Sequence, residues 1–515
     1  MADDDFWDAE LEAEARDEQE ERRWSWASVL GTSYGLSAAL HLGVLVVLAT
    51  IVIALPAPRE AKVTVIVPPA PRIEREPPPE AEAAMEDTPE VPIPEEVVEP
   101  VIELIEVPEP PDVSAGEPDN AANKDLQDRS FDDAYGPGGP PAGIVGRGDR
   151  KRAAARIGGV PQPRSKATAD ALRWLKRHQD PSGRWDADGW QRACDRGGCA
   201  GPDGGRGDKG GAGYDVGVTA LALLAFLGDG HTPRWGAFKR VVKKGFGWLA
   251  RQQRPDGSLG HVEGGHGGMY SHALATLALA ECYLLERHPA WRRPAQRAVD
   301  FCLAAQNPGL AWKYQVKGGR NDTSVTGWMV LALKAARAAG LDVPSGAFSG
   351  ALSWVERATD SQGRVGYESP GGGSSFLPET DGRYEQLPVL TAVGVLCRQL
   401  VGEGARDPAV RQGVQLLAAQ PPAWEPRRVS FYYWYYGTYV AYQAGGRHWE
   451  RWAEALLAAL LPSQRRDACA HGSWDGVGEW CVAGGRVYAT ALAALTFEAW
   501  YRVERRETPA TGSGR

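Results

Sequence analysis

Residues 215–227 read DVGVTALALLAFL, and five later segments repeat this pattern of a threonine in an apolar run, four of them with a polar or aromatic start. They are HALATLALAECYL (272–284), DTSVTGWMVLALK (322–334), LPVLTAVGVLCRQL (387–400), WYYGTYVAYQA (434–444) and RVYATALAALTFEAW (486–500). Segments that are apolar nearly all round are typical of helices buried on most sides. Their threonines recur every 47 to 65 residues, and a recurring unit of this size indicates a repeat architecture.

A second, amphipathic segment precedes each apolar one, and five of these six segments end on glutamine. They are ALRWLKRHQ (171–179), GFGWLARQQ (245–253), AVDFCLAAQ (298–306), ALSWVERAT (351–359), GVQLLAAQ (413–420) and ALLAALLPSQ (455–464). A turn containing glycine follows several of them, as in QDPSGRW at 179–185, and glycine permits positive φ there. The pattern predicts an all-α domain over 166–505: an α/α6 toroid of six helix pairs, with apolar helices inside. A disordered tail is expected at 506–515.

The residues before this domain have a different composition. Residues 1–23 are acidic and expected to be disordered, and 24–58 are expected to form a transmembrane segment with its core at 36–55 (LSAALHLGVLVVLATIVIAL). Twenty apolar residues suffice to cross a bilayer as one helix; a buried soluble helix is the alternative. Residues 59–165 form a Pro/Glu/Gly-rich linker, disordered and in part extended, because such a composition favours polyproline-like structure and cannot bury a core.

Charge divides the chain in the same place. The first 165 residues hold 15 Lys and Arg against 33 Asp and Glu, whereas the rest holds 42 against 33. The domain lacks a dense basic stripe with interleaved aromatic residues, so we expect no nucleic-acid partner. An acidic front before a mildly basic domain suits a solvated spacer.

The Gln-x-x-x-Gly-x-Trp turn at 179–185 and its looser copies resemble the QW motifs of squalene-hopene and oxidosqualene cyclases and the repeats of prenyltransferase β-subunits. The resemblance covers the whole domain and implies an α/α6 toroid. The front end resembles TonB-type energy-transducing proteins in layout and composition. That resemblance implies a bacterial inner-membrane protein with one span, a cytoplasmic N-terminus and the toroid in the periplasm.

The catalytic motifs of these families are only partly present in this sequence. Class II terpene cyclases begin their reaction with an Asp-x-Asp-Asp motif whose middle Asp donates a proton. The corresponding stretch here is Gly319 to Ser324, in which only Asp322 matches and Asn321 stands at the donor position. An amide cannot protonate an alkene. No Asp-x-Cys lies at the start of an apolar helix with a matching downstream His, as the zinc site of the prenyltransferases requires, and the CGEQ thioester of complement-like rings is absent, so we expect no metal and no cofactor.

A polar and aromatic rim is predicted where the apolar helices begin. Four residues before each repeat threonine, on the same helix face, stand Asp215, His272, Asp322, Leu387, Trp434 and Arg486, and near them lie Tyr214, Tyr270, Asn321, Glu385, Tyr435, Tyr436 and Tyr488. Such a rim above an apolar throat is typical of a ligand pocket. The alternative is that Asp215 and Asp322 are helix caps and His272 a buried structural residue. Asp322 with His272 could form an acid/base pair, or join Asp215 in holding a metal.

Four of the seven cysteines lie in loops. Cys194 and Cys199 share the insert CDRGGC, and Cys469 and Cys481 bracket CAHGSWDGVGEWC. Two local disulfides suit an oxidising compartment; a four-thiolate metal site is the alternative. Cys282, Cys302 and Cys397 fall in helices and are expected in the core.

Two functions follow as hypotheses. In the first, a membrane-tethered periplasmic toroid binds a lipid-like or isoprenoid, glycan or peptide ligand without catalysis. In the second, it is an isoprenoid cyclase or a transferase-like enzyme that uses Asp322, with His272, as its acid and base.

Overall fold

The computed structural model describes residues 156–157, 160–194, 208–260, 267–372, 387–401 and 407–502. Within these ranges the elements of regular secondary structure are helices, apart from two strands of two residues each. These strands, β1 (Arg156–Ile157) and β2 (Val160–Pro161), pair antiparallel. None of the helices there is long and apolar enough to span a membrane. The predicted span at 36–55, the acidic tail and most of the linker lie outside the described residues.

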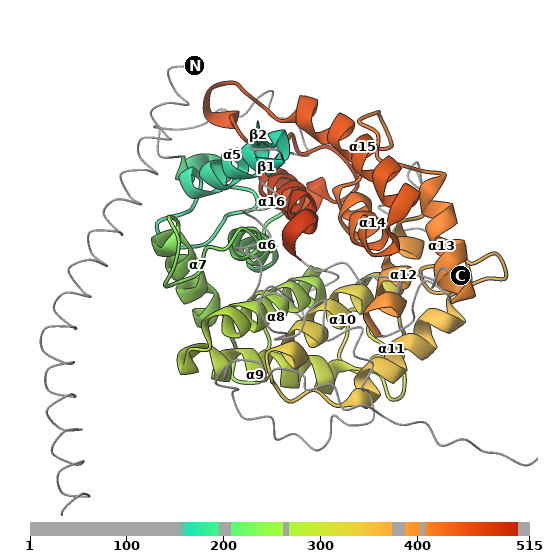
Figure 1. The fold of residues 1–515 in the computed structure, drawn as a ribbon. Coiled ribbons are helices and arrows are strands. Elements are labelled where there is room, and N and C mark those ends of the chain that lie inside the picture. Colours follow the sequence, from blue (N-terminus) through green and yellow to red (C-terminus); the bar gives the residue numbers. More distant parts are fainter. Residues whose placement is uncertain are drawn as a thin grey trace, which may run out of the picture. The chain divides into compact units, whose positions relative to one another are not determined.

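The helices form two concentric layers (Figure 1). The inner layer contains α6 (Asp215–Gly228), α8 (Gly267–Glu286), α10 (Thr323–Ala338), α12 (Val389–Val401), α14 (Phe431–Ala444) and α16 (Cys481–Arg502). The outer layer contains α5 (Pro163–Arg177), α7 (Lys239–Arg251), α9 (Pro289–Ala305), α11 (Ser345–Arg357), α13 (Pro408–Ala418) and α15 (Gly446–Ser463). Each inner helix contacts the inner helices before and after it, and α16 contacts α6. The described part is therefore a closed α/α toroid, as expected for the fold class.

Four of the glutamines that end outer helices each link their helix to the next outer helix. The Gln179 Nε2 atom donates to the Gly183 carbonyl in its own turn, at 2.9 Å, and to Val241 O of the next repeat, at 3.0 Å. Gln253 and Gln306 make the same pair of bonds one and two repeats later. Gln464 donates to Gly472 O and to Ala167 O on α5, so it joins the last repeat to the first.

The glycine of this turn is required by a close approach between neighbouring repeats. Gly183 has a φ of +106°, and a Cβ atom there would lie 2.3 Å from Lys244 O. Gly257 has a φ of +91°, and its Cβ would lie 2.2 Å from Arg297 O. Only glycine combines a positive φ with so short a distance to another backbone. The turn residues of the sequence pattern are thus explained by contacts between repeats.

The repeat threonines and the turn tryptophans hold the two layers together. Thr219 Oγ1 accepts from Trp185 N at 2.9 Å, and the Trp185 Nε1 atom donates to Leu175 O of α5 at 2.8 Å. Thr490 and Trp474 repeat both contacts in the sixth unit. The threonine side of each such inner helix therefore points outward, towards the outer layer.

We predict that Gln464→Ala lowers the free energy of unfolding by about 1–3 kcal/mol, because two backbone carbonyls lose their donor. Chemical denaturation of the full chain, followed by tryptophan fluorescence, measures this change. Gln412→Ala, at an exposed position of α13, is the control and should change stability by less than about 0.5 kcal/mol. Equal effects of the two substitutions would contradict the role of Gln464 in closing the ring.

Candidate functional site

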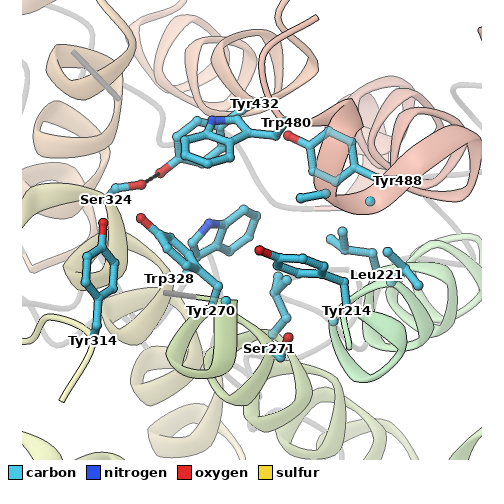
Figure 2. Close-up of a pocket in the computed structure, with 16 residues that line it drawn as sticks. Tyr214, Leu221, Tyr270, Ser271, Tyr314, Ser324, Trp328, Tyr432, Trp480 and Tyr488 are labelled. Carbon is cyan, nitrogen blue, oxygen red and sulfur yellow. Dashed lines mark hydrogen bonds between the residues drawn. The ribbon is translucent and has the colours of Figure 1, made fainter. Parts of the chain in front are cut away.

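The inner helices surround a cavity of about 210 Å³ near their N-terminal ends. Figure 2 shows aromatic side chains from several helices converging on it. Its aromatic lining consists of Tyr214, Tyr270, Tyr314, Trp328, Tyr432, Trp480 and Tyr488. Gly217, Val218, Leu221, Gly267, Ser271, Leu274, Ser324, Ala483 and Gly484 complete the lining. None of these described residues carries a formal charge.

The tyrosine hydroxyls make this lining a set of hydrogen-bond donors and acceptors on apolar walls. Ser324 Oγ and the Tyr432 hydroxyl lie 2.9 Å apart and share a hydrogen bond. Burial raises the pKa of Tyr270, Tyr432 and Tyr488. These hydroxyls therefore stay protonated at neutral pH and remain able to donate.

Three predicted rim residues, Tyr214, Tyr270 and Tyr488, line the cavity. Glu385 lies outside the described residues, and the remaining members do not line this cavity: Asp215, His272, Asn321, Asp322, Leu387, Trp434, Tyr435, Tyr436 and Arg486. The physical reason is helix geometry. A residue four positions before the threonine shares its face, and that face points outward in the repeats described above. The residue two positions before it lies about 200° round the helix, and in four repeats that residue lines the cavity: Gly217, Leu274, Ser324 and Tyr488. In the fifth repeat Tyr436 has this position but packs against Trp328 instead.

Asp322 caps the N-terminus of α10, and its Oδ1 atom accepts from Val325 N at 2.7 Å. The side chain is fully buried, and Oδ2 receives no hydrogen bond from the described residues. Burial raises the pKa of this carboxyl to about 7, opposed by the Val325 amide and by the charge of Lys313. Asp322 is therefore a helix cap, which was the alternative to a ligand-binding role. Its carboxyl also keeps its proton up to near-neutral pH.

Two tyrosines connect Asp322 to the cavity. The charge of Asp322 contributes, after burial, to raising the pKa of Tyr367, and the Tyr367 hydroxyl bonds to that of Tyr314, which lines the cavity. Sequence reasoning missed both residues. Tyr314 precedes α10 and Tyr367 follows α11, so no helical periodicity marks them.

His272 has both ring nitrogens engaged by the backbone. Nδ1 accepts from Leu259 N at 3.2 Å, and Nε2 bonds to Ala298 O at 3.1 Å. These contacts fix the neutral tautomer, and burial lowers its pKa to about 4. The buried Cys302 Sγ lies 3.3 Å from Nε2, and burial raises that thiol's pKa to about 12. This placement corresponds to the structural role weighed for His272, and it brings the ring to neither Asp215 nor Asp322.

Asn321 and Arg486 are also held by the scaffold. Asn321 Oδ1 accepts from Asn307 Nδ2 at 3.0 Å and from Ala311 N at 2.9 Å. The fully buried Arg486 guanidinium bonds to both carboxylate oxygens of Asp208, at 2.9 and 2.8 Å. Trp434 packs against Phe431 and Trp424, whereas Tyr435 and Tyr436 pack against Trp328. Tyr435 and Tyr436 therefore contact Trp328, a residue of the cavity lining, without lining the cavity themselves.

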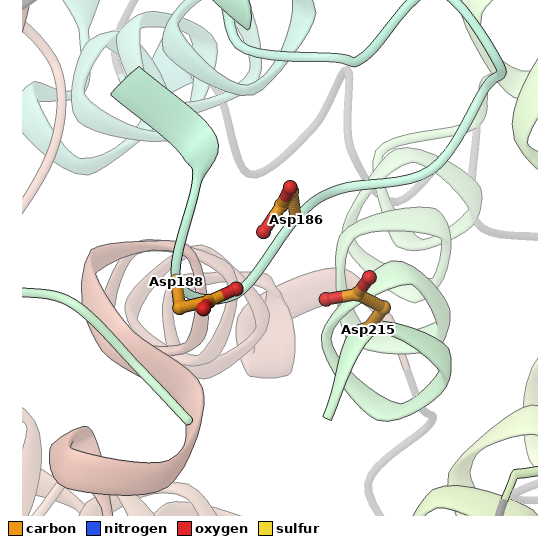
Figure 3. A group of neighbouring side chains, drawn as sticks. All are labelled: Asp186, Asp188 and Asp215. Carbon is orange, nitrogen blue, oxygen red and sulfur yellow. The ribbon is translucent and has the colours of Figure 1, made fainter. Parts of the chain in front are cut away.

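Asp215 belongs to a group of three acidic side chains with Asp186 and Asp188, whose oxygens lie within 4.8 Å of one another (Figure 3). Arg184 bonds to Asp215 at 2.8 Å and to Asp186 at 3.1 Å, and Arg192 bonds to Asp186 at 3.1 Å. Burial raises the pKa of Asp215. The group differs from the Asp215, His272 and Asp322 set considered from sequence, and two guanidinium groups balance most of its charge.

The predicted Cys469–Cys481 disulfide is wrong, because both thiols are free. Cys469 belongs to the turn after outer helix α15, whereas Cys481 begins inner helix α16, where its thiol donates to Val477 O at 3.1 Å. The two cysteines thus belong to different layers. Cys194 is buried, and Cys199 lies outside the described residues, so the other predicted disulfide stays a prediction. Cys282, Cys302 and Cys397 are buried in helices, as expected.

Comparison with known proteins gives limited matches. No family model matches the chain. A curated relative, an MMP endo-(1,4)-3-O-methyl-alpha-D-mannosidase from Mycolicibacterium hassiacum, is 35% identical over 71 residues, which are 14% of this chain and 18% of the relative. The chain thus matches less than a fifth of that protein's length.

Similar solved structures include a protein from Actinoplanes, 18% identical, covering 65% of this chain and 99% of that one with a TM-score of 0.41. The type II terpene cyclase MstE from Scytonema is 15% identical, covering 65% and 97% with a TM-score of 0.43. A variant of that cyclase in complex with merosterolic acid A is 14% identical, covering 66% and 98% with a TM-score of 0.42.

Proposed function

We propose that this protein is a membrane-tethered ligand-binding toroid whose central cavity takes an uncharged, partly apolar ligand. The observation that carries the proposal is the cavity lining, which combines seven aromatic side chains with tyrosine and serine hydroxyls and contains no charged residue. Aromatic faces pack against apolar chains or the C–H faces of sugars, and hydroxyls add directional hydrogen bonds. A charged ligand group would lose its hydration there without a counter-charge.

Isoprenoid-like lipids and uncharged glycans fit this lining better than peptides. A peptide brings a backbone amide and carbonyl with every residue, and each needs a partner when buried. The name of the mannosidase relative refers to a methylated sugar, which is the kind of uncharged, partly apolar unit that such a lining suits. The ligand class is therefore proposed as lipid or glycan.

The tether belongs to the same proposal. Residues 36–55 have the length and composition of one membrane span, and the Pro/Glu-rich stretch after them separates the span from the toroid. The TonB-like layout favours a cytoplasmic N-terminus and a toroid in the periplasm. Fusing a periplasm-active reporter to either end of the full chain tests the orientation.

Filling the cavity should remove the ligand. Ala483 lines the cavity and is partly exposed, so Ala483→Trp adds an indole without deleting core packing. We expect native mass spectrometry of the full chain, purified from its membranes, to show a bound mass that the variant loses by at least about tenfold in occupancy, because the indole occupies the ligand's space. The bound mass also identifies the ligand class.

Ala453→Trp, at a partly exposed position of outer helix α15, adds the same group away from the cavity and is the control. It should retain the ligand. Retention by both variants, or loss by both, would refute the cavity as the binding site. Since no charged side chain lines the cavity, occupancy should also be insensitive to salt.

A second function, acid catalysis on an isoprenoid substrate, is favoured by one observation. Asp322 is a buried carboxyl with a pKa of about 7, and its charge acts on Tyr367 and on Tyr314, a residue that lines the cavity. A group with that pKa is suited to donate or accept a proton at neutral pH. The amide of Asn321 at the usual donor position and the engaged ring of His272 disfavour cyclase chemistry of the usual kind.

The two functions are separated by product analysis. The full chain is incubated with squalene, polyprenyl diphosphates and polyprenyl alcohols, and products are analysed by gas chromatography and mass spectrometry. A product that Asp322→Asn abolishes would establish catalysis and refute the binding-only function. Absence of turnover with all of these substrates would refute the catalytic one.

A further inference from the structure

The outer surface of the toroid is unevenly charged. The neighbouring helices α7 and α9 carry eight Lys and Arg and a single acidic residue, Asp300. On the opposite side of the ring (Figure 1), α13 and α15 carry three Arg and two Glu. Helix α5, which precedes α7 in the outer layer, carries five Lys and Arg and one Asp. The excess of positive charge therefore covers α5, α7 and α9 and is small on α13 and α15.

The two basic helices lie side by side in the outer layer. Phe246 of α7 and Trp291 of α9 have ring centroids 5.4 Å apart, and Gln253 donates to Pro294 O at 2.9 Å. The helices therefore pack as neighbours. Their exposed basic residues include Arg240, Lys243, Lys244, Arg292 and Arg293.

An exposed tryptophan lies beside this surface. Trp235 is 52% exposed in the loop between α6 and α7, and it is the one aromatic among the large apolar side chains exposed in the described residues. Thr232 bonds to Glu286, and Arg234 Nε lies 3.8 Å from the same carboxylate. Glu286 is the last residue of α8, so these contacts hold the Trp235 loop next to the start of α9.

We propose that this surface, comprising the Trp235 loop, α7 and the first turns of α9, docks the toroid onto a bilayer containing anionic lipids. Lys and Arg near an anionic bilayer are each attracted to it. A tryptophan among them supplies an amphipathic ring that prefers the headgroup region. The proposal uses the predicted tether only to bring a bilayer within reach, and it is independent of what the cavity binds.

The inference is tested on the full chain in lipid nanodiscs by hydrogen exchange. One set contains phosphatidylcholine alone, and the other contains three parts in ten of phosphatidylglycerol. We expect amides in 229–251 and 287–297 to be protected in the anionic nanodiscs and not in the neutral ones, and the protection to fall with added salt. A chain without a membrane span would fail to enter either nanodisc, which separates failure of the tether from failure of docking.

Substitutions with a matched control sharpen the test. The triple variant Arg240→Ala, Lys243→Ala, Lys244→Ala should weaken docking on the order of 100-fold, from about one kcal/mol per charge. The control is Arg411→Ala, Arg447→Ala, Arg451→Ala, three exposed arginines of α13 and α15. Equal protection in both lipid compositions, or equal loss in both triple variants, would overturn the proposal. Protection by a DNA oligonucleotide but not by phosphatidylglycerol would also overturn it and identify a nucleic-acid surface.

Discussion

Replacing Arg502 with methionine should lower the free energy of unfolding by about 3–5 kcal/mol, because it leaves two carboxylates buried without their counter-charge. Arg502 bonds to both oxygens of Glu281, at 2.9 and 2.8 Å, and to Glu498 at 2.9 Å. It also donates to Leu224 O at 3.0 Å. One guanidinium therefore joins three neighbouring inner helices, α6, α8 and α16, and all three charged side chains are buried.

Chemical denaturation of the full chain in detergent measures this loss. Adding Glu281→Gln and Glu498→Gln to Arg502→Met should recover part of it, because neutral amides cost less to bury than unpaired carboxylates. Arg451→Met, exposed on α15, is the control and should change stability by less than about 0.5 kcal/mol. A change below about 1 kcal/mol for Arg502→Met would show that the network does not hold the repeats together.

Asp322→Asn should stabilise the toroid at pH 8 by about 2–4 kcal/mol and leave it nearly unchanged at pH 4. The folded pKa of about 7 lies above the value of 3.8 for a solvated aspartate. Below pH 4 both states are protonated, and the carboxyl is equally neutral in each. Between pH 4 and pH 7 the unfolded chain loses its proton while the folded chain keeps it. The free energy of unfolding of the wild type therefore falls as the pH rises through this window.

Asparagine stays neutral throughout and still caps α10, since its side-chain oxygen can accept from Val325 N as Asp322 does. Denaturation at pH 4, 6 and 8 measures the difference between the two proteins. Asp407→Asn is the control, because Asp407 also caps a helix, α13, but from a partly exposed position. A constant difference between Asp322→Asn and wild type from pH 4 to pH 8 would show that Asp322 is not held neutral in the fold.

The same substitution connects stability to function. The ionised carboxyl of Asp322 lowers the free energy of unfolding at neutral pH. Buried groups with raised pKa values are common at functional sites. If Asp322→Asn is more stable at pH 8 and also loses a product, the carboxyl serves catalysis. If it is more stable and keeps its bound ligand, Asp322 is a cap next to a binding cavity.

Much of the architecture could be predicted from residue order, because helix periodicity and turn glycines are local properties. The apolar segments became inner helices, the amphipathic ones outer helices, and Gln179, Gln253, Gln306 and Gln464 each lie at a turn. The glutamines bond to the next repeat as well as to their own turn. That second bond could not be read from one repeat, since it depends on how neighbours pack.

The rim was predicted in part, and the residues four positions before the threonines were misplaced for one reason. Sequence spacing placed Asp215, His272 and Arg486 on the face of the repeat threonine, which is correct, but the sequence does not state which way that face points. Hydrogen bonds from Trp185 and Trp474 to Thr219 and Thr490 direct it outward. Residues of the opposite face, such as Ser324 and Tyr488, line the cavity instead.

By itself, the sequence determined the helical repeat, the layer of each helix and the absence of the usual cyclase acid at Asn321, because each of these depends on residues close together in the chain. The tertiary structure alone decided which side chains meet at the axis. Tyr270, Tyr314, Tyr432 and Tyr488 come from four different repeats, and their convergence is set by ring closure. Tyr367 reaches Tyr314 across 53 residues, and Arg502 reaches Glu281 across 221. Contacts over such separations leave no local pattern, since only the packing of complete repeats brings their partners together.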